Sequence, residues 1–266
     1  FLGPNGSGKT TTIKVLLGLI RATAGSATMF GQPVPSVGAR ARVGFLPENP
    51  YVYPYLTARE FVEMSGRLSG MGGAAVRKRT EEVLDRTGVL YAADREARRL
   101  SKGMLQRTAL AAALVADPEM LILDEPMSGL DPVGRKEVRE LILEERDAGR
   151  TIFFSTHILS DVEAQCDHVT ILRAGEVVVS GAIRKLLRGD VLHTDITLAG
   201  STDELRHDLA EAGHGVHERP DVVVVEVVGE QAVAAVLEQA LGAGAQVLEV
   251  TPRRETLEDL FMKRAL

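Results

Sequence analysis

Continuous apolar runs alternate along much of the chain with segments in which apolar residues recur at every third or fourth position. A continuous run is typical of a strand buried on both faces, and the wider spacing is typical of an amphipathic helix. The clearest runs are residues 120–123 and 151–155, and Val138, Leu141 and Ile142 lie on one face of the helix predicted between them. This alternation predicts an α/β fold with a mostly parallel sheet, which binds its ligands beyond the carboxyl ends of the strands.

Capping residues and chain-breaking residues set the ends of the other predicted elements. Thr57, with Glu60 three residues later, has the pattern of a capping box, and Ser101 and Asp131 are also predicted to cap helices. The predicted strands are 27–30, 42–46, 120–123, 151–155 and a hairpin at 169–179, and the predicted helices are 11–20, 57–69, 75–87, 101–117 and 131–149. These helices include a helical insert at about 55–116, between two strands of the sheet.

The pattern changes near residues 188–190, and we expect domains at 1–189 and 190–266. The elements predicted in the second domain are strand 194–198, helix 202–212, strand 222–228, helix 230–241, strand 246–250 and an amphipathic helix from Glu255. Such an order indicates a small α+β domain. Because it contains no motif that carries chemistry, we expect it to have an accessory or regulatory role.

Composition and charge narrow the class of protein. The 266 residues are 45% hydrophobic, which suffices for a sizeable core. A formal net charge of −6 argues against binding nucleic acid through a basic surface. Cys166 is the only cysteine, so an internal disulfide is excluded. No apolar run reaches the roughly 18 residues of a membrane-spanning helix, and any membrane association is expected to be peripheral.

Residues 3–10 have the pattern of a phosphate-binding loop: Gly, four free positions, then Gly-Lys-Thr. The glycines let backbone N–H groups turn toward a phosphate, Lys9 supplies a positive charge, and Thr10 supplies a hydroxyl for Mg²⁺. Thr11 opens a helix whose positive end faces the bound anion. The predicted nucleotide contacts in this stretch are Gly3, Pro4, Asn5, Gly6, Ser7, Gly8, Lys9, Thr10 and Thr11.

Acidic residues and a histidine follow three of the predicted strands. Asp124 and Glu125 end one buried strand, and Glu48 and His157 lie just beyond two others. Because the carboxyl ends of parallel strands meet at one edge of a sheet, we expect these side chains to lie close to the bound phosphate. Phosphoryl transfer to water needs a metal ligand, a base that orients the water and donors to the γ-phosphate. This group of residues can supply them.

These motifs, in this order, resemble those of the ATP-binding subunit of an ABC transporter, and the resemblance covers residues 1–185. The motifs are the Walker A loop at 3–10, the signature at 100–106, the Walker B strand at 120–126, the D-loop at 128–131 and the switch histidine His157. The resemblance implies a P-loop NTPase fold of the ABC cassette type, with a mostly parallel sheet and a helical subdomain. The chain opens on Phe1, only two residues ahead of the loop, and we expect an amino-terminally truncated chain. The aromatic residue that stacks on adenine in this family would precede Phe1.

The resemblance also implies ATP and Mg²⁺ as ligands and gives roles to the site residues. Glu125 would polarise the attacking water, His157 would contact the γ-phosphate and link it to Glu125, and Lys9 would neutralise phosphate charge. The metal ligands would be Thr10, Asp124 and Glu48.

Two cassettes pack head to tail in this family. The resemblance therefore implies that Ser101 and Gly103, with Asp131, contact the ATP held by the loop of a second cassette. The signature departs from the family pattern, because Lys102 replaces its first glycine and Met104 replaces its glutamine. An ordinary serine-capped helix is the alternative interpretation of this stretch.

Glu48 stands where the family usually has the glutamine of the Q-loop. A solvated loop carboxylate is the alternative interpretation. The Leu-Pro-Glu sequence at 46–48, the Ser-Lys-Gly-Met signature and the tail at 256–261 resemble the branch that exports drugs, antibiotics or polysaccharides. A transmembrane permease would then be the partner, and the chain would lie on the cytoplasmic face of the membrane.

Two other functions stay open at this point. One is a non-transport ABC ATPase that acts on DNA or ribosomes; the chain lacks the long insertion or second cassette of such proteins, its balance is acidic, and we expect no nucleic-acid partner. The other is an ATP-binding regulatory module with weak or no turnover. The altered signature favours that module, whereas the intact Asp124, Glu125 and His157 argue against it.

Overall fold

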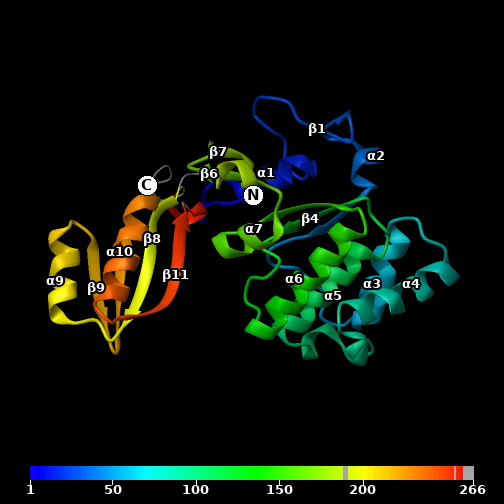
Figure 1. The fold of residues 1–266 in the computed structure, drawn as a ribbon. Helices are drawn as coiled ribbons and strands as arrows, with labels where there is room; N and C mark the ends of the chain where they lie inside the picture. The colour runs from blue at the N-terminus through cyan, green and yellow to red at the C-terminus, as the bar shows by residue number, and fades with distance from the viewer. Residues whose placement is uncertain (188–190, 255, 260–266) are drawn as a thin grey trace. The chain divides into compact units, whose positions relative to one another are not determined.

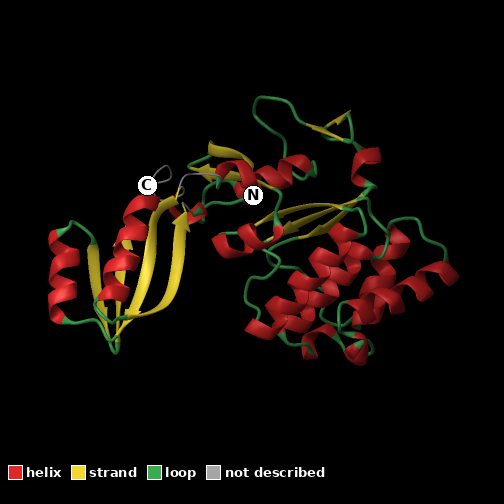
Figure 2. Cartoon of the chain, viewed as in Figure 1, coloured by secondary structure: helices red, strands yellow, loops and turns green. Residues whose placement is uncertain are grey.

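The computed structural model describes residues 1–187, 191–254 and 256–259. The chain divides into two compact units, Phe1–Ser180 and Gly181–Leu266, called unit 1 and unit 2 below. The residues at the expected boundary, 189/190, lie outside the described ranges. Figure 1 labels the elements and Figure 2 distinguishes the helices from the strands.

A three-stranded parallel sheet forms the centre of unit 1 (Figure 2). Its strands, in spatial order, are β3 (Val43–Leu46), β4 (Met120–Asp124) and β5 (Thr151–Ser155). Asp124 pairs with Ser155 at the carboxyl ends of β4 and β5. Leu2 forms single parallel bridges to Thr156 and Ile171, so the residues just before the phosphate loop also join neighbouring strands. The predicted parallel sheet is confirmed.

Strand β4 is buried on both faces because different helices cover them. Ile122 packs with Ile13 on one face, while Leu121 and Leu123 pack with Val138 and other apolar side chains on the opposite face. The helices that contribute to these clusters include α1 (Lys9–Leu16), α5 (Lys102–Leu114) and α6 (Pro132–Asp147). A strand that is covered on both faces has a continuous apolar sequence, and β4 was predicted from that pattern.

The helical insert consists of α3 (Ala58–Leu68), α4 (Gly73–Arg86) and α5. The capping box predicted at Thr57 is present: its side chain accepts a hydrogen bond from the backbone N–H of Glu60, and its backbone N–H donates to the Glu60 carboxylate. Further elements of unit 1 are β1 (Thr28–Met29), β2 (Gln32–Pro33), α2 (Val37–Arg40), two 3₁₀ turns (Leu90–Ala92 and Ala97–Arg99), α7 (Leu159–Gln165), β6 (His168–Arg173) and β7 (Glu176–Ala182).

Unit 2 contains an antiparallel sheet with two helices on one face (Figure 1). Its strands, in the spatial order β11-β8-β10-β9, are β11 (Gln246–Arg254), β8 (Val191–Ala199), β10 (Val222–Val227) and β9 (Gly215–Arg219). Its helices are α8 (Ile183–Leu186), α9 (Asp203–Glu211) and α10 (Glu230–Gly242). Ile196, Leu198, Val225 and Val227 form a buried cluster with apolar residues of α9 and α10. The opposite face of the sheet carries the alternate residues of each strand.

Strand β9 was not predicted. Its sequence, Gly-Val-His-Glu-Arg, holds one apolar residue and gives no periodic signal, and its pairing with β10 is what defines it. The elements predicted at 194–198, 202–212, 222–228, 230–241 and 246–250 are present with shifted ends. The helix expected from Glu255 lies largely outside the described residues.

Candidate active site

The phosphate loop joins Leu2 to helix α1, which begins at Lys9 and therefore earlier than predicted. Gly6 and Gly8 have φ angles of 79° and 104°, in the left-handed region that favours glycine. At Gly3 a Cβ atom would lie 2.5 Å from the carbonyl oxygen of Leu172. These glycines are therefore required by the backbone path, and the path turns the loop around the amino-terminal end of α1.

A cavity of about 250 Å³ lies against this loop. The residues that line it are Asn5, Gly6, Gly8, Lys9, Thr10, Thr11, Glu48 and Glu125. The fold thus brings Glu48, after β3, and Glu125, after β4, to the loop from distant parts of the sequence. This is the arrangement expected from the strand ends, and the cavity is the place where a phosphate chain fits the donors and the charge of the loop.

Lys9 is held inside the loop. Its Nζ donates to the carbonyl oxygens of Gly3, at 2.8 Å, and of Pro4, at 3.3 Å, and lies 3.5 Å from Oε1 of Glu125. The side chains of Lys9 and Glu125 are 7% and 8% exposed, so this charge pair is screened little by water. The positive charge therefore sits at the wall of the cavity, opposite a carboxylate.

Glu125 is positioned by its backbone and by His157. Its φ angle is 49°, an unusual value for a residue other than glycine, and its N–H donates to Oγ of Ser155 at 3.1 Å. Nδ1 of His157 lies 2.9 Å from Oε2 of Glu125. Oε1 is buried and accepts no hydrogen bond from any described residue. Oε1 faces the Lys9 ammonium at 3.5 Å, and a carboxylate at the wall of a cavity is suited to accept a proton.

Asp124 lies one residue earlier and is 1% exposed. Its Oδ1 accepts a hydrogen bond from Oγ of Ser155, the residue opposite it on β5. Asp124 does not line the cavity directly, and neither do Gly3, Pro4, Ser7 or His157.

Ser101, Gly103 and Asp131 lie elsewhere in unit 1. Oγ of Ser101 accepts from the backbone N–H of Met104 at 3.3 Å and caps α5, and Asp131 accepts from the N–H of Gly134 at 2.8 Å and caps α6. Both predicted caps are confirmed. These residues do not line the cavity at the phosphate loop.

Two residues of the site were missed from the sequence. Ser155 joins Asp124 to the backbone of Glu125, as described above, and could have been found from the parallel register of β4 and β5. The buried Gln106 donates from Nε2 to the carbonyl oxygen of Pro126 at 3.0 Å, and so ties α5 to the turn after β4. Its place in the signature was the only available signal.

The chain is similar to known proteins in sequence and in fold. The ABC transporter family model matches residues 1–128. An uncharacterized ABC transporter ATP-binding protein of Synechocystis is 41% identical over 99% of this chain and 73% of its own length. The uncharacterized ABC transporter ATP-binding protein YxlF of Bacillus subtilis is 35% identical over 98% of this chain and 88% of its own length.

Two further similarities extend this result. The Nod factor export ATP-binding protein I of Burkholderia orbicola is 34% identical over 98% of this chain and 86% of its own length. A solved structure of an ATP-binding subunit of an ABC transporter has a TM-score of 0.64 and 31% identity, and the match covers 70% of this chain and 79% of that one.

The phosphate loop, the buried strand β4 and the carboxylates at its end define a P-loop nucleotide hydrolase. The chain belongs to the ATP-binding proteins of ABC transporters. It is the ATPase subunit of such a transporter, and both the resemblance and the fold class inferred from its motifs are confirmed.

Proposed function

We propose that this chain hydrolyses ATP in a head-to-tail dimer of cassettes and thereby drives export through a transmembrane permease. The hydrogen-bonded pair of Glu125 and His157, beside the cavity of the phosphate loop, carries the proposal for hydrolysis. The name of the Nod factor export relative supports the direction of transport. The chain would lie on the cytoplasmic face of the membrane, bound peripherally to the permease.

Glu125 is the proposed general base. ATP, when bound, supplies the phosphoryl group that is transferred to water. The carboxylate of Glu125 takes a proton from that water, while His157, with Nδ1 protonated, holds Oε2 and fixes the carboxylate. Lys9 contributes positive charge at the same wall of the cavity.

Thr10, Asp124 and Glu48 are the proposed residues that hold Mg²⁺. Their donor set, a hydroxyl and two carboxylates, has the oxygen chemistry that Mg²⁺ prefers. Thr10 and Glu48 line the cavity, and Asp124 directly precedes Glu125 in the sequence. The metal would neutralise phosphate charge during transfer.

Ser101, Gly103 and Asp131 are proposed to contact the ATP of a second cassette. Ser101 is the exposed cap residue of α5; its Oγ accepts from the N–H of Met104, and its hydroxyl hydrogen can be donated to a partner. A helix of 13 residues has a positive end that suits a γ-phosphate. None of the three lines this chain's own cavity, which fits a role in the dimer.

The substitution Glu125→Gln tests hydrolysis. We expect ATP binding to persist and the hydrolysis rate to fall by about 10²–10⁴-fold, because the amide cannot accept the proton. A nucleotide-bound dimer should then accumulate in size-exclusion chromatography. The control is Glu144→Gln, an exposed glutamate on α6, which should hydrolyse ATP at the wild-type rate. Turnover in Glu125→Gln equal to that of the wild type would contradict the assignment of Glu125 as the base, whereas ATP binding without turnover in the wild type would favour a regulatory module.

Glu48 is proposed to link the nucleotide site to the permease. It is exposed, it lines the cavity, and it follows β3 just before the helical insert, so it joins two rigid parts of unit 1. A carboxylate adds negative charge beside the phosphates, which makes its position depend on the metal.

ATPase activity and transport should be measured against Mg²⁺ concentration for wild type, Glu48→Gln and Glu48→Ala. We expect Glu48→Gln to keep most of the activity at high Mg²⁺ and Glu48→Ala to lose transport more than ATP binding. If Glu48→Ala couples hydrolysis to transport as wild type does, Glu48 is a solvated loop residue.

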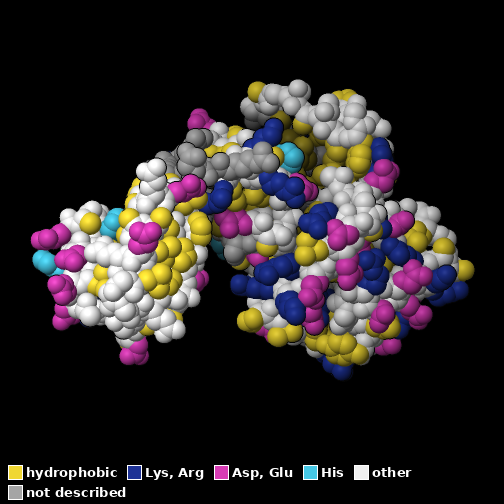
Figure 3. Space-filling view, in the orientation of Figure 1, with side chains coloured by type: hydrophobic (Ala, Val, Ile, Leu, Met, Phe, Trp, Pro, Cys, Tyr) yellow, Lys and Arg dark blue, Asp and Glu magenta, His cyan; other side chains and the backbone are white. Residues whose placement is uncertain are grey.

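The surface charges bear on the alternative of an ABC ATPase that acts on nucleic acid. In the parts of the chain that the structure describes, no helix is long and apolar enough to cross a membrane. On the face shown in Figure 3, acidic and basic side chains are interspersed over the helical insert, where ion pairs join Arg59 to Asp94 and Arg79 to Asp117. Paired charges of this kind do not favour the phosphate backbone of a nucleic acid.

A further inference from the structure

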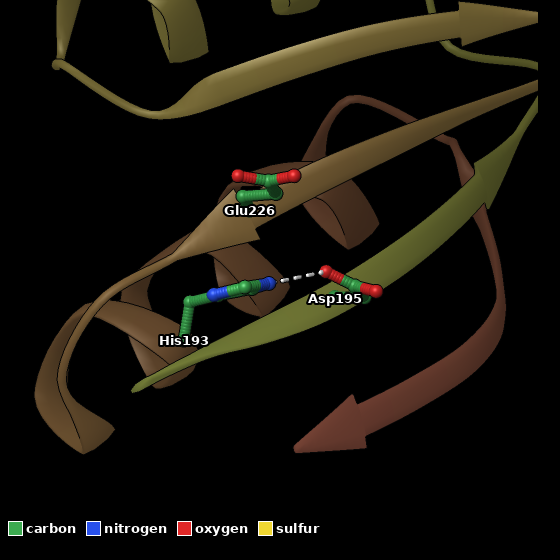
Figure 4. A group of neighbouring side chains, drawn as sticks. All are labelled: His193, Asp195 and Glu226. Atoms are coloured by element: carbon green, nitrogen blue, oxygen red, sulfur yellow. Dashed lines mark ion pairs between the residues drawn. The ribbon is translucent and has the colours of Figure 1, made fainter. Parts of the chain in front are cut away.

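Unit 2 carries three side chains of the kinds that coordinate metal ions, on the face of its sheet opposite α9 and α10. His193 and Asp195 lie two residues apart on β8, and Glu226 lies on the adjacent strand β10 (Figure 4). One nitrogen or oxygen atom from each of the three lies within 4.8 Å of those of the other two. All three residues are half-buried. The fold therefore gathers an imidazole and two carboxylates at one point.

The two carboxylates stand directly opposite each other. Asp195 is the cross-strand partner of Glu226 in the antiparallel ladder of β8 and β10. Like charges at opposed positions destabilise a sheet unless something neutralises them. The pairing thus calls for positive charge between the strands.

Each carboxylate is held on one oxygen by a residue of an outer strand. Arg253 on β11 donates from Nε to Oδ2 of Asp195 at 2.6 Å. His217 on β9 places Nε2 3.0 Å from Oε1 of Glu226. In metal sites, residues outside the first coordination shell commonly donate a hydrogen bond to one oxygen of a carboxylate ligand. Arg253 and His217 are placed to do so.

The other oxygen of Asp195 has no hydrogen bond. Oδ1 is buried and accepts none from any described residue, although Nε2 of His193 lies 3.3 Å away. A buried acceptor without a partner is uncommon and costs free energy. Because Oδ1 faces the imidazole and the group that contains Glu226, a cation bound among the three would satisfy it.

We propose that His193, Asp195 and Glu226 bind a divalent transition-metal ion, with Zn²⁺ the best fit. One nitrogen and two carboxylate oxygens are ligands that Zn²⁺ accepts, with water in the fourth position. Ca²⁺ and Mg²⁺ prefer six or more oxygen ligands and are disfavoured by the imidazole. Tetrahedral bonds of about 2.0–2.1 Å put ligand atoms roughly 3.3 Å apart, so small side-chain rotations close the site from the present separations.

The two residues that contact the proposed carboxylate ligands then have defined roles. His217 is a positioning residue that orients Glu226, and Arg253 orients Asp195. A bound ion links β8 to β10 and neutralises the opposed carboxylates. An ion-pair network without metal is the competing account, in which Arg253 and the histidines alone offset the negative charge.

Zn²⁺ binding decides between these accounts. The tag-free, nucleotide-free full chain should be stripped of metal and titrated with Zn²⁺ in competition with a chromogenic chelator. We expect His193→Ala to lose one equivalent of bound Zn²⁺. Its affinity for Zn²⁺ should fall by more than about 100-fold, which exceeds the 10–100-fold typical when a residue outside the first coordination shell is removed. His217→Ala should weaken binding by about 10-fold, because Glu226 loses its orienting partner.

The control is His207→Ala. His207 forms an exposed pair with Glu211 on α9, at 3.3 Å, and has the same chemistry without a third ligand. Its loss should leave Zn²⁺ binding unchanged. Equal binding in wild type and His193→Ala, or an equal loss in His207→Ala, would overturn the proposal.

Diffraction keeps the test decisive if a variant does not fold. Zn²⁺-soaked crystals of the wild-type chain should show an anomalous peak bonded to Nε2 of His193 and to oxygens of Asp195 and Glu226. Mg²⁺ or Ca²⁺ at the same concentration should not displace it. A map without a peak among these three residues would refute the site.

Discussion

The two units place their chemistry differently because their sheets are covered differently. In unit 1, helices cover both faces of β4, so its interior residues are apolar and the ionisable Asp124 and Glu125 stand at the end of the strand. In unit 2, α9 and α10 pack on one face of the sheet, no helix of the described residues is seen to pack on the other, and Glu226 lies within β10 among valines. A sheet buried on both faces confines chemistry to the strand ends, whereas a half-open antiparallel sheet can carry it at mid-strand.

The charge environments differ in the same way. In unit 1, Lys9 and Glu125 line a cavity, and His157 holds the carboxylate of Glu125. Asp195 and Glu226 in unit 2 are held from the flanking strands and face each other. The first arrangement suits turnover of a ligand, and the second suits a bound ion.

The largest expected effect is that of Ile196→Ala on unit 2 alone. Ile196 is fully buried under α9 and α10, so the cavity should cost about 2–5 kcal/mol of the stability of that unit. Urea unfolding should show unit 2 melting earlier while ATP binding by unit 1 persists. The control Thr197→Ala, at the half-buried neighbouring position, should cost less than half as much. Loss of ATP binding together with unit 2 would show that the two units do not fold independently.

Gly44→Ala should destabilise unit 1 by about 1–3 kcal/mol, because its covered sheet has no room for a methyl group. An added Cβ would lie 2.2 Å from the carbonyl oxygen of Ala113 and 2.8 Å from Cδ2 of Leu121. Gly73→Ala is the control: no heavy atom lies within 4 Å of its Cβ position, and alanine favours the first turn of α4. Thermal unfolding that ranks the two variants in the opposite order would contradict the packing of β3.

The helix caps give a smaller and symmetrical test. Thr57 caps α3 in unit 1 and Thr202 caps α9 in unit 2, and each substitution to alanine should cost about 1 kcal/mol. Thr57→Ala should cost more, because it breaks a capping box with Glu60. Each variant should shift only the transition of its own unit in calorimetry. A shift of both transitions by one variant would indicate that the units unfold as one.

Cys166 gives the smallest effect and reports on unit 1 only. Burial raises the pKa of its thiol to about 11, so the reactive thiolate is scarcer at pH 8 than for an ordinary cysteine. Reaction with a thiol reagent should be slow in the native state, rise as pH approaches 11, and become fast in urea as unit 1 opens. Since it is the only cysteine, the signal is unambiguous. Fast native reaction at pH 8 would contradict the burial.

Local signals in the sequence determined most elements and the phosphate loop. The cap and proline at Asp131 and Pro132, the capping box at Thr57, and the positive φ angles of Gly6 and Gly8 act within a few residues. Gly3 differs, because its contact is with the distant Leu172. The apolar run of β4 was equally clear, because a fully covered strand needs no partner to be recognised. Strand β9 was missed because only its pairing with β10 makes it a strand.

Tertiary structure decided which distant residues meet. His157 reaches Glu125 because β4 and β5 pair in parallel with Asp124 opposite Ser155. Asp195 meets Glu226 only in the antiparallel register of β8 and β10, and a shift of one residue would send either side chain to the other face of the sheet. The sequence order suggested the first contact, since strand ends of a parallel sheet share an edge. The second had no such signal, because antiparallel register depends on how whole strands pack.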